Sequence, residues 1–431
     1  MKKQNFSCTK VCVGYELGEE YCQMNIISPD SKGEIISVKA NPMEDTIRIP
    51  FALAKRKGVE QWYYGKEALN KAQEGEGILV TDLYGHMVEE TPVFIEEKEY
   101  DIGILLSMYL KKTLSLLLHY VSLEQIDGCT FVVPTLDKKM VYMWQKALES
   151  ILIDKEKCFL ISYEEAFAYY TAFQEEVQVE KGVLLLDYNG GILTAKLLQS
   201  RGNTQPKLLR VKELLQQEIE AEDEKFLECV RGIFAQCRPL VVYLTGDGFE
   251  KRWYETSLKF LCQGRRVFKG QNLYGTGGLW YAMERLQVAH SGCVYFGEEH
   301  IRMNFVIQAR SLGKGCSREQ EVELLSADLH WYEAKKTVEV IPQSYEMVEV
   351  MAKSLDGKRQ QVFSVKLKDF PVREKKATRL ELSVYFREKN IGVIQIRDLG
   401  FGEIYPATGK VWQEGFDLQL VEEKLNEGIW G

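Results

Sequence analysis

Three turns that follow apolar strands hold the residues that could do chemistry. In the second of them, Leu184 to Gly191 reads Leu-Leu-Leu-Asp-Tyr-Asn-Gly-Gly, so an apolar strand leads into Asp187 and two glycines. A buried strand that ends this way brings a carboxylate and bare backbone N–H groups to one point, where they can meet a hydrated metal and an anion. Glycines also follow strands simply because the next turn needs a positive φ, so this stretch alone leaves both interpretations open.

The other two turns have the same composition. The first follows Val11 to Val13 and contains Glu16 and Gly18. The third follows Leu240 to Leu244 and contains Gly246 and Gly248. Three such turns in order along the chain predict one divided site.

The elements that must position these turns alternate between strands and helices. The periodicity predicts helices over 103–121, 138–153, 164–174, 207–236 and 276–287, with strands at 129–133, 158–161, 183–187 and 240–245. Short strands, including 33–38 and 47–50, come before them. Alternating strands and helices predict an α/β architecture. The acidic segment 213–228 has an apolar stripe, so we expect a helix with one solvated face there rather than an acidic partner site.

Past residue 292 strand patterns dominate. In Leu380 to Phe386 the apolar residues fall at alternate positions, which is the period of a strand with one buried face. We therefore expect an α/β domain over 1–290, an all-β domain over 291–418 and a short tail over 419–431.

Composition narrows the function classes. The 431 residues are 45% apolar, and the net charge of -8 argues against nucleic acid as a partner because phosphate backbones are bound through clustered Lys and Arg. The ten cysteines form no C-x-x-C pair, the start has no apolar signal-peptide core, and the segment 104–121 is interrupted by charges. These features predict a cytoplasmic protein without a membrane span, and no histidine has a metal-ligand spacing.

The order of the motifs resembles the heat-shock chaperones of the DnaK type, which share their ATPase fold with actin and the sugar kinases. The landmarks of this resemblance are, in chain order, the turn at Val13 to Gly18, Ile49-Pro50 followed by Gly65 to Ala68, Val132 to Thr135, Leu160 to Tyr170, the turn after Asp187, and Leu244 to Gly248. Phe363 to Pro371 and the hairpin through Gly392 to Ile396 resemble the peptide-binding β-sandwich of those chaperones. The resemblance covers nearly the whole chain.

The resemblance implies a two-lobed actin-like ATPase fold with ribonuclease H-like lobes, followed by an all-β sandwich. It implies a cleft for Mg-ATP or Mg-ADP, with magnesium held through water near Glu16 and Asp187. Asp187 and Glu164 are the catalytic candidates, and proteins or extended peptides are the implied partners. The cleft candidates are Glu16, Gly18, Asp187, Gly190, Gly191, Gly246 and Gly248.

Several departures from the family argue against catalysis. Glu16 and the following Glu19 and Glu20 stand where the family has Asp and hydroxyl residues. A carboxylate about 4 Å from a phosphate charge is repelled by roughly 4 kcal/mol at an effective dielectric near 20. Ile192 follows the second turn where the family has a hydroxyl donor, and the catalytic Glu of the family falls near Tyr163. Phosphoryl transfer depends on positioned charge, so these losses should be severe.

Three hypotheses follow. The leading one is a DnaK-like binding scaffold in which ATPase activity is absent or residual. The second is a working Mg-ATP-dependent chaperone with altered phosphate loops. The third, a kinase or filament protein of the same superfamily, is disfavoured by the all-β domain after residue 292. The sequence does not identify a client or the oligomeric state.

Overall fold

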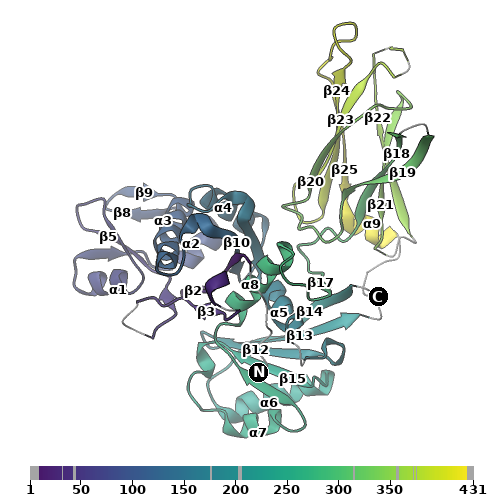
Figure 1. Cartoon of the computed structure of the whole chain (residues 1–431). Helices are drawn as coiled ribbons and strands as arrows, with labels where there is room; N and C mark the ends of the chain where they lie inside the picture. The colour runs from purple at the N-terminus through teal and green to yellow at the C-terminus, as the bar shows by residue number, and fades with distance from the viewer. Residues whose placement is uncertain are drawn as a thin grey trace. The chain divides into compact units, whose positions relative to one another are not determined.

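The computed structural model describes residues 9–31, 33–41, 45–174, 177–201, 206–313, 316–355, 359–371, 373–374 and 376–424. The start of the chain, where no signal peptide was expected, and the last part of the predicted 419–431 tail lie outside these residues. The chain divides into two compact units, Met1–Tyr295 and Phe296–Gly431 (Figure 1). The boundary expected from the sequence was at residue 290.

The first lobe of unit 1 is a mixed sheet in the order β11-β10-β1-β2-β3. β1 pairs with β2 in antiparallel fashion and with β10 in parallel, and β10 is also parallel to β11. A short strand, β4, pairs with the other end of β2. The strands are β1 (Val11–Leu17), β2 (Tyr21–Ile27), β3 (Ile36–Ser37), β4 (Ile49–Pro50), β10 (Ile126–Val133) and β11 (Cys158–Ser162).

The second lobe repeats this topology in a sheet of order β16-β15-β12-β13-β14-β17. β12 pairs with β13 in antiparallel fashion and with β15 in parallel, as β1 does with β2 and β10. The strands are β12 (Val183–Asn189), β13 (Ile192–Arg201), β14 (Lys207–Glu218), β15 (Val241–Thr245), β16 (Arg266–Lys269) and β17 (Cys293–Tyr295). Two lobes with one repeated strand order give unit 1 an actin-like α/β fold.

Helices cover both faces of the second sheet, which explains why β12 reads as an uninterrupted apolar run. Val183 and Leu185 face a core that includes α5 and α8 residues, whereas Leu184 and Leu186 face α6. Figure 1 shows α6 and α7 on the side of the sheet away from α5 and α8. These helices are α5 (Tyr163–Ala172), α6 (Asp223–Gln236), α7 (Glu255–Leu261) and α8 (Leu273–Arg285).

Side-chain caps fix where several helices begin. Asp101 accepts the backbone N–H of Ile104 at the start of α3, and Asp137 accepts that of Met140 at the start of α4. The remaining elements of unit 1 belong to the first lobe. They are β5 (Leu53–Arg56), β6 (Trp62–Tyr64), α1 (Gly65–Gln73), β7 (Gly77–Leu79), α2 (Leu83–Glu89), β8 (Val93–Ile95), β9 (Lys98–Tyr100), α3 (Ile102–Leu114) and α4 (Lys138–Leu148).

The apolar segment that contains α3 packs in the first lobe. Ile102–His119 is long and apolar enough to span a membrane by length and composition, but 56% of it is buried inside the structure. The Tyr109 hydroxyl donates to the Pro50 carbonyl, 2.9 Å away, and Leu105 and Leu110 are fully buried. This packing agrees with the expectation of a core helix.

One secondary-structure prediction is wrong. The segment 207–236, expected to be one helix, folds into strand β14 and helix α6, with a turn between them. Leu and Glu favour helices, but β14 pairs with β13 from Leu208 to Glu218, and this tertiary pairing overrides the local preference. The acidic segment 213–228 therefore spans the end of a strand and the start of a helix.

Unit 2 contains two four-stranded antiparallel sheets of order β19-β18-β21-β22 and β20-β23-β24-β25. Phe305 on β18 contacts Phe386 on β23 and Phe416 on β25, so aromatic rings join the two sheets. The elements are β18 (Asn304–Gly313), β19 (Cys316–Leu325), β20 (Lys335–Val340), β21 (Met347–Lys353), β22 (Gln360–Lys366), β23 (Arg379–Phe386), β24 (Ile391–Gly400), β25 (Val411–Asp417) and α9 (Leu418–Lys424).

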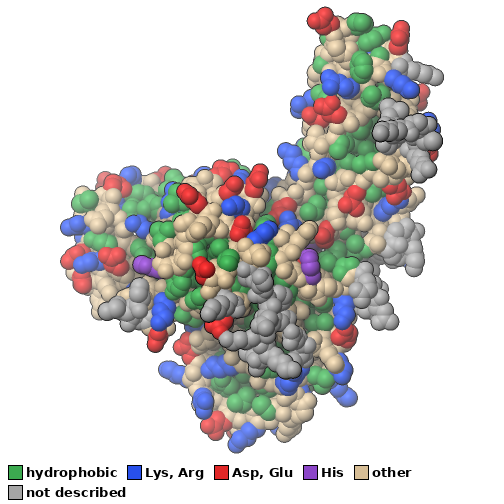
Figure 2. Space-filling view, in the orientation of Figure 1, with side chains coloured by type: hydrophobic (Ala, Val, Ile, Leu, Met, Phe, Trp, Pro, Cys, Tyr) green, Lys and Arg blue, Asp and Glu red, His purple; other side chains and the backbone are tan. Residues whose placement is uncertain are grey.

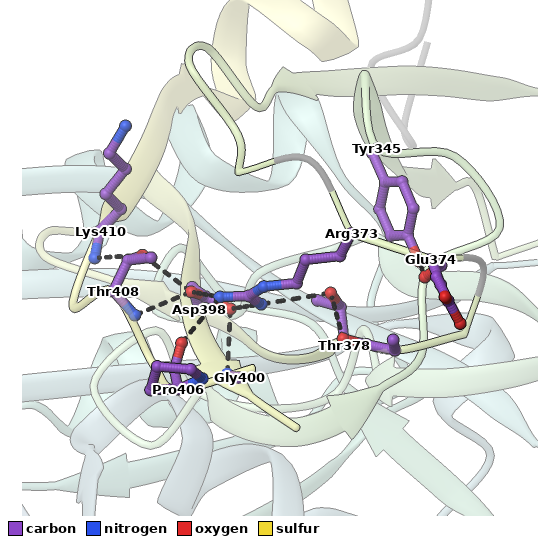
Figure 3. Close-up of polar contacts among 10 residues, drawn as sticks. Tyr345, Arg373, Glu374, Thr378, Asp398, Gly400, Pro406, Thr408 and Lys410 are labelled. Carbon is purple, nitrogen blue, oxygen red and sulfur yellow. Dashed lines mark hydrogen bonds and ion pairs between the residues drawn. The ribbon is translucent and has the colours of Figure 1, made fainter. Parts of the chain in front are cut away.

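A buried ion pair anchors one end of unit 2. Arg373 donates two hydrogen bonds to Asp398, at 2.7 and 2.8 Å, and a third to the Pro406 carbonyl (Figure 3). Asp398 also accepts from the backbone N–H groups of Gly400 and Thr408. Every oxygen of this buried carboxylate is thus satisfied, which is the condition under which a buried ion pair is tolerated. The cluster holds the loop between β24 and β25 to the segment before β23.

Basic and acidic side chains are interspersed over the visible face of unit 1 (Figure 2). A protein that binds a nucleic acid through its phosphates usually gathers Lys and Arg on one face. The exclusion of nucleic acid nevertheless stays a prediction from composition.

Candidate functional site

The turn after β12 has a geometric reason for its glycines. Asn189 pairs with Ile192, so Gly190 and Gly191 form a two-residue hairpin loop, with φ values of 55° and 82°. A loop with two positive φ values matches the right-handed twist of the flanking strands, and glycine adopts it without strain. The hairpin accounts for these two candidate residues without a phosphate.

The glycines of the third turn accommodate a tyrosine. A Cβ atom at Gly246 would lie 2.3 Å from the Tyr188 carbonyl oxygen, and one at Gly248 would lie 2.2 Å from Cδ1 of the Tyr188 ring. The Tyr188 hydroxyl donates to the Ile219 carbonyl at 2.8 Å, and its ring contacts Trp253. The side chain that follows Asp187 therefore covers the turn that was expected to approach a phosphate.

The first turn closes with a hydrogen bond from the Gly18 N–H to the Tyr21 carbonyl, 2.9 Å long. Glu19 and Glu20 in this turn are exposed, whereas Glu16 is only 1% exposed. The expected repulsion of phosphate by Glu19 and Glu20 is therefore weakened by solvent.

Glu16 is surrounded by donors. One carboxylate oxygen, Oε2, accepts from Gln23 Nε2 at 2.6 Å and from the backbone N–H of Gly275 at 3.1 Å. The other oxygen accepts from the Tyr163 hydroxyl at 3.4 Å. Burial raises the pKa of Glu16 to about 7, although the hydrogen bonds from Gln23 and Gly275 oppose the rise.

Asp187 is held in a similar way in the other lobe. Its Oδ2 accepts from the Tyr274 hydroxyl at 2.6 Å, and its Oδ1 accepts from the Asn189 side-chain amide. Asn189 in turn accepts the Asp247 backbone N–H at 3.0 Å, which ties the second turn to the third. Burial raises the pKa of Asp187 to about 6, and the bond from Tyr274 opposes the rise.

The two tyrosines that contact these carboxylates stack on each other. The ring centroids of Tyr163 and Tyr274 are 3.9 Å apart, and the ring planes differ by 16°. Burial raises the pKa of both phenols well above the usual value, so both hydroxyls stay protonated and donate. A continuous set of contacts thus runs from Glu16 through the stacked rings to Asp187, and it joins the two lobes.

Close helix packing positions the stack. Tyr163 opens α5 and Tyr274 lies in the first turn of α8. A Cβ atom at Gly277 would lie 2.0 Å from the Ala166 carbonyl oxygen, so only glycine allows α8 to approach α5 this closely. A Cβ atom at Gly14 would lie 1.9 Å from the Gly275 carbonyl oxygen, so the start of α8 also rests directly on β1.

A second set of polar contacts joins the lobes beside the stack. Arg48 forms an ion pair with Glu250 at 2.8 Å, and the Gln271 side-chain amide donates to Glu250 as well. Gln23 donates to the Gln271 carbonyl at 2.7 Å. These contacts close the region between the first and third turns with the chain's own side chains.

Glu164, a catalytic candidate, has other partners. It forms an ion pair with Lys196 at 3.0 Å and accepts from the Tyr295 hydroxyl at 3.2 Å. The structure therefore places it in a cluster that ties α5 to β13 and β17.

Mg-ATP does not fit these residues as they are arranged. Three of the four carboxylate oxygens accept a hydrogen bond of 2.5 or 2.6 Å, and the fourth, Glu16 Oε1, has one contact of 3.4 Å. The Tyr188 ring covers Gly248. The hydroxyls of the Tyr163–Tyr274 stack thus make contacts to Glu16 and Asp187 that water-bound magnesium would use.

The stack was not predicted from the sequence. Tyr163 was noted only as the position near which the family's catalytic Glu falls, and Tyr274 was not singled out. A signal was present in Gly275-Thr276-Gly277-Gly278, since such a run of small residues indicates close approach of another element. Sequence spacing also missed a pair of buried histidines in unit 2, His300 and His330, whose ring centroids are 4.5 Å apart.

Comparison with models of known protein families shows which family the chain belongs to. A family model described as "Family of unknown function (DUF5716) C-terminal" matches residues 34–298. The chain belongs to this family. The match spans most of unit 1, including Asp187 and both stacked tyrosines, and the first turn, with Glu16, precedes the matched residues. Residues 300–418 match a second model, "Domain of unknown function (DUF8552)".

No curated protein matches the chain. Among solved structures, it is similar to a non-polymerising mutant of MamK bound to AMPPNP, with a TM-score of 0.41 and 9% sequence identity. The likeness covers 64% of this chain and 100% of that one. The actin-like fold of this DUF5716 family member rests on the repeated strand order of its two lobes.

Proposed function

We propose that this chain is a binding scaffold for proteins or extended peptides, built on an actin-like ATPase fold in which ATPase activity is absent or residual. The observation that carries the proposal is the Tyr163–Tyr274 stack, with its hydroxyls on Glu16 and Asp187. These carboxylates are the ones that the resemblance assigns to water-bound magnesium.

Charge supports the same proposal. Phosphoryl transfer depends almost entirely on positioned charge and metal ions. Burial raises the pKa of Glu16 to about 7 and that of Asp187 to about 6, so the pair carries less negative charge near neutral pH than two ordinary carboxylates. A weakly charged pair that already accepts hydrogen bonds from neutral donors attracts a hydrated cation poorly.

The test is the melting temperature of the full chain during a titration with Mg-ATP. A ligand present at about a hundred times its dissociation constant adds about 2.7 kcal/mol to the free energy of unfolding, which is an easily measured shift. We expect no shift at millimolar Mg-ATP for the wild type. A shift that is lost in Asp187→Ala would reject the proposal.

The alternative is a functional Mg-ATP-dependent chaperone with altered phosphate loops. One observation favours it, because several polar atoms near Glu16 and Asp187 lack a hydrogen-bond partner among the described residues: Nε and Nη2 of Arg48, Oε1 of Gln23 and Oδ1 of Asp247. A polar ligand or water would satisfy them. Nucleotide binding in the titration above would select this alternative.

The finer likeness to DnaK-type chaperones rests on the sequence landmarks. Under this proposal unit 2 is a β-sandwich that holds an extended apolar peptide without a helical lid, so we expect fast dissociation. An array of apolar peptides probed with the full chain tests this, and no binding to any peptide would count against it. Eight described cysteines are free thiols, which is in keeping with the proposed cytoplasmic location.

A further inference from the structure

A groove opens between the second half of β14 and helix α6 in unit 1. Its volume is about 670 Å³. Leu214, Leu215, Ile219 and Ile233 give it an apolar floor, and their packing continues into the core of the second lobe. The rim is polar and contains three glutamates. The segment that the sequence interpreted as one acidic helix therefore forms both walls of a groove.

One wall of the groove is a free strand edge. β14 pairs with β13 from Leu208 to Glu218, but β17 covers its outer side only from Lys207 to Leu209. Within the described residues, no strand pairs with the outer side of β14 beyond Leu209. Unpaired edges of this length are a template for another strand, and proteins usually cover or blunt them.

The ladder shows which backbone groups face outward. Ile219 donates its backbone N–H to the Gly191 carbonyl, at 2.9 Å, on the β13 side. In an antiparallel pair, alternate residues direct their backbone groups to opposite sides. The N–H and C=O groups of Glu218 and Gln216 therefore point to the free edge. A register shift between Ala195 and Lys196 marks a bulge at Leu214, and the pairing from Leu215 to Glu218 continues without a further shift.

The charge of the rim indicates the kind of partner. Glu218, Glu220 and Glu228 line the groove, with Lys225 as the cation among the lining residues. Lys225 already forms ion pairs with Glu220 and Glu222. Glu218 and Glu228 have no ion-pair partner among the residues that the structure describes. The groove thus offers uncompensated negative charge above an apolar floor.

We propose that this groove binds an extended basic segment of a partner protein, which adds a strand to the free edge of β14. In this mode the main-chain hydrogen bonds supply affinity, and pockets for alternate side chains supply specificity. Apolar side chains of the segment would enter the groove toward Ile219 and Ile233, and Lys or Arg side chains would meet Glu218 and Glu228. A basic partner segment at this groove rests on the proposed function of the chain as a scaffold that binds proteins or extended peptides.

The test uses the full chain and a fluorescent synthetic peptide of about eight residues, the length of a typical strand, in which lysine and valine alternate. Two control peptides accompany it. One carries N-methyl groups on alternate backbone nitrogens, which removes strand pairing and keeps the charge. The other has glutamate in place of lysine. We expect fluorescence anisotropy to detect the first peptide and to show at least tenfold weaker binding of both controls.

Two single variants address the groove itself. Gln216→Pro removes an outward N–H, which an edge strand tolerates, and should weaken peptide binding about tenfold. Gly232→Trp should also weaken it, because a Cβ atom at this groove residue meets nothing within 4 Å, so the added ring has open space to fill. The matched control is Gly270→Trp, which is equally open but follows β16 at the opposite edge of the sheet.

Equal binding of the parent and N-methylated peptides would overturn the proposal. Unchanged binding by both Gln216→Pro and Gly232→Trp, or no binding of the lysine peptide at about 1 mM, would overturn it as well. Circular dichroism checks that each variant is folded. Failure here is separable from failure of the scaffold function, because the Mg-ATP titration does not involve the groove and the peptide titration does not involve Glu16 or Asp187.

Discussion

Unit 1 contains one site that its own side chains fill and one that stays open. At the turns after β1, β12 and β15, the chain's own side chains occupy the space, and a Cβ atom at Gly248 would lie 2.2 Å from Tyr188. In the groove between β14 and α6, a Cβ atom at Gly232 would meet nothing within 4 Å. Glycines and carboxylates line both places. The structural role of a glycine therefore depends on its neighbours, since Gly248 makes room for the Tyr188 ring whereas Gly232 borders open space.

Protonation of the buried carboxylate should give the largest effect. The pKa of Glu16 rises from 4.5 to about 7, so the folded state holds a proton that the unfolded state releases in this range. The stability that the folded protein gains from binding this proton at Glu16 is fully present below pH 4.5 and is lost as the pH rises to about 7. We expect Glu16→Gln to remove the loss, which amounts to about 3 kcal/mol. Urea unfolding between about pH 4 and 8 measures it.

The groove supplies the control for this prediction. A hydrogen bond from Lys225 lowers the pKa of Glu220, so the contribution of Glu220 is present above its ordinary pKa and disappears as the pH falls. Glu220→Gln should therefore leave the slope between about pH 5 and 7 unchanged. Parallel pH profiles for wild type and Glu16→Gln would contradict the assignment of buried charge to Glu16.

Gly248→Ala should give the next largest effect. The added methyl group collides with a Tyr188 ring that Trp253 and Phe249 hold in place, and we expect a loss of about 2 kcal/mol. The same substitution in a Tyr188→Ala background removes the collision, so the two changes should be strongly non-additive. Additive losses in urea unfolding would show that Tyr188 is not what occupies this turn.

Removal of one hydroxyl from the stack should cost less. Tyr274→Phe keeps the ring but leaves Asp187 without a donor at 2.6 Å, and we expect a loss of about 1 to 2 kcal/mol at neutral pH. Tyr163→Phe removes a contact of 3.4 Å and should have a smaller effect. If chemical denaturation finds the Tyr163 variant the more destabilised of the two, the geometry described for the stack is wrong.

The smallest effect should be a gain. Gly232→Ala lies within α6, where a methyl group meets no neighbour, so the higher helix propensity of alanine should stabilise the protein by up to about 1 kcal/mol. Gly277→Ala in α8 is the matched comparison, because its methyl group would lie 2.0 Å from the Ala166 carbonyl oxygen. Equal melting temperatures for the two variants would contradict the distinction between filled and open sites.

The sequence predicted those features that local pattern determines. Apolar runs located β12 and β15, and the helices expected to begin at 138 and 164 begin at Lys138 and Tyr163. The order of the three turns indicated an actin-like fold, which the repeated strand order supports. The helix expected over 207–236 was wrong because pairing with β13, a tertiary contact, determines the conformation of β14.

The site itself was only partly predictable. Glu16, Asp187 and the glycines of the turns were identified, and the structure brings Glu16 and Asp187 to the two sides of one tyrosine pair. Tyr163 and Tyr274 lie far apart in the chain, so no local period places one ring on the other. The close approach of α5 and α8 at Gly277, which sets the stack, likewise exists only in the folded molecule.

The most direct test of a filled nucleotide site is calorimetric titration of Mg-ATP into the wild-type chain and into the variant Asp187→Ala. The account predicts no detectable binding to the wild type at a nucleotide concentration of about 1 mM, which sets a limit near -4 kcal/mol. Saturable binding of Mg-ATP to the wild type, lost in Asp187→Ala, would contradict it.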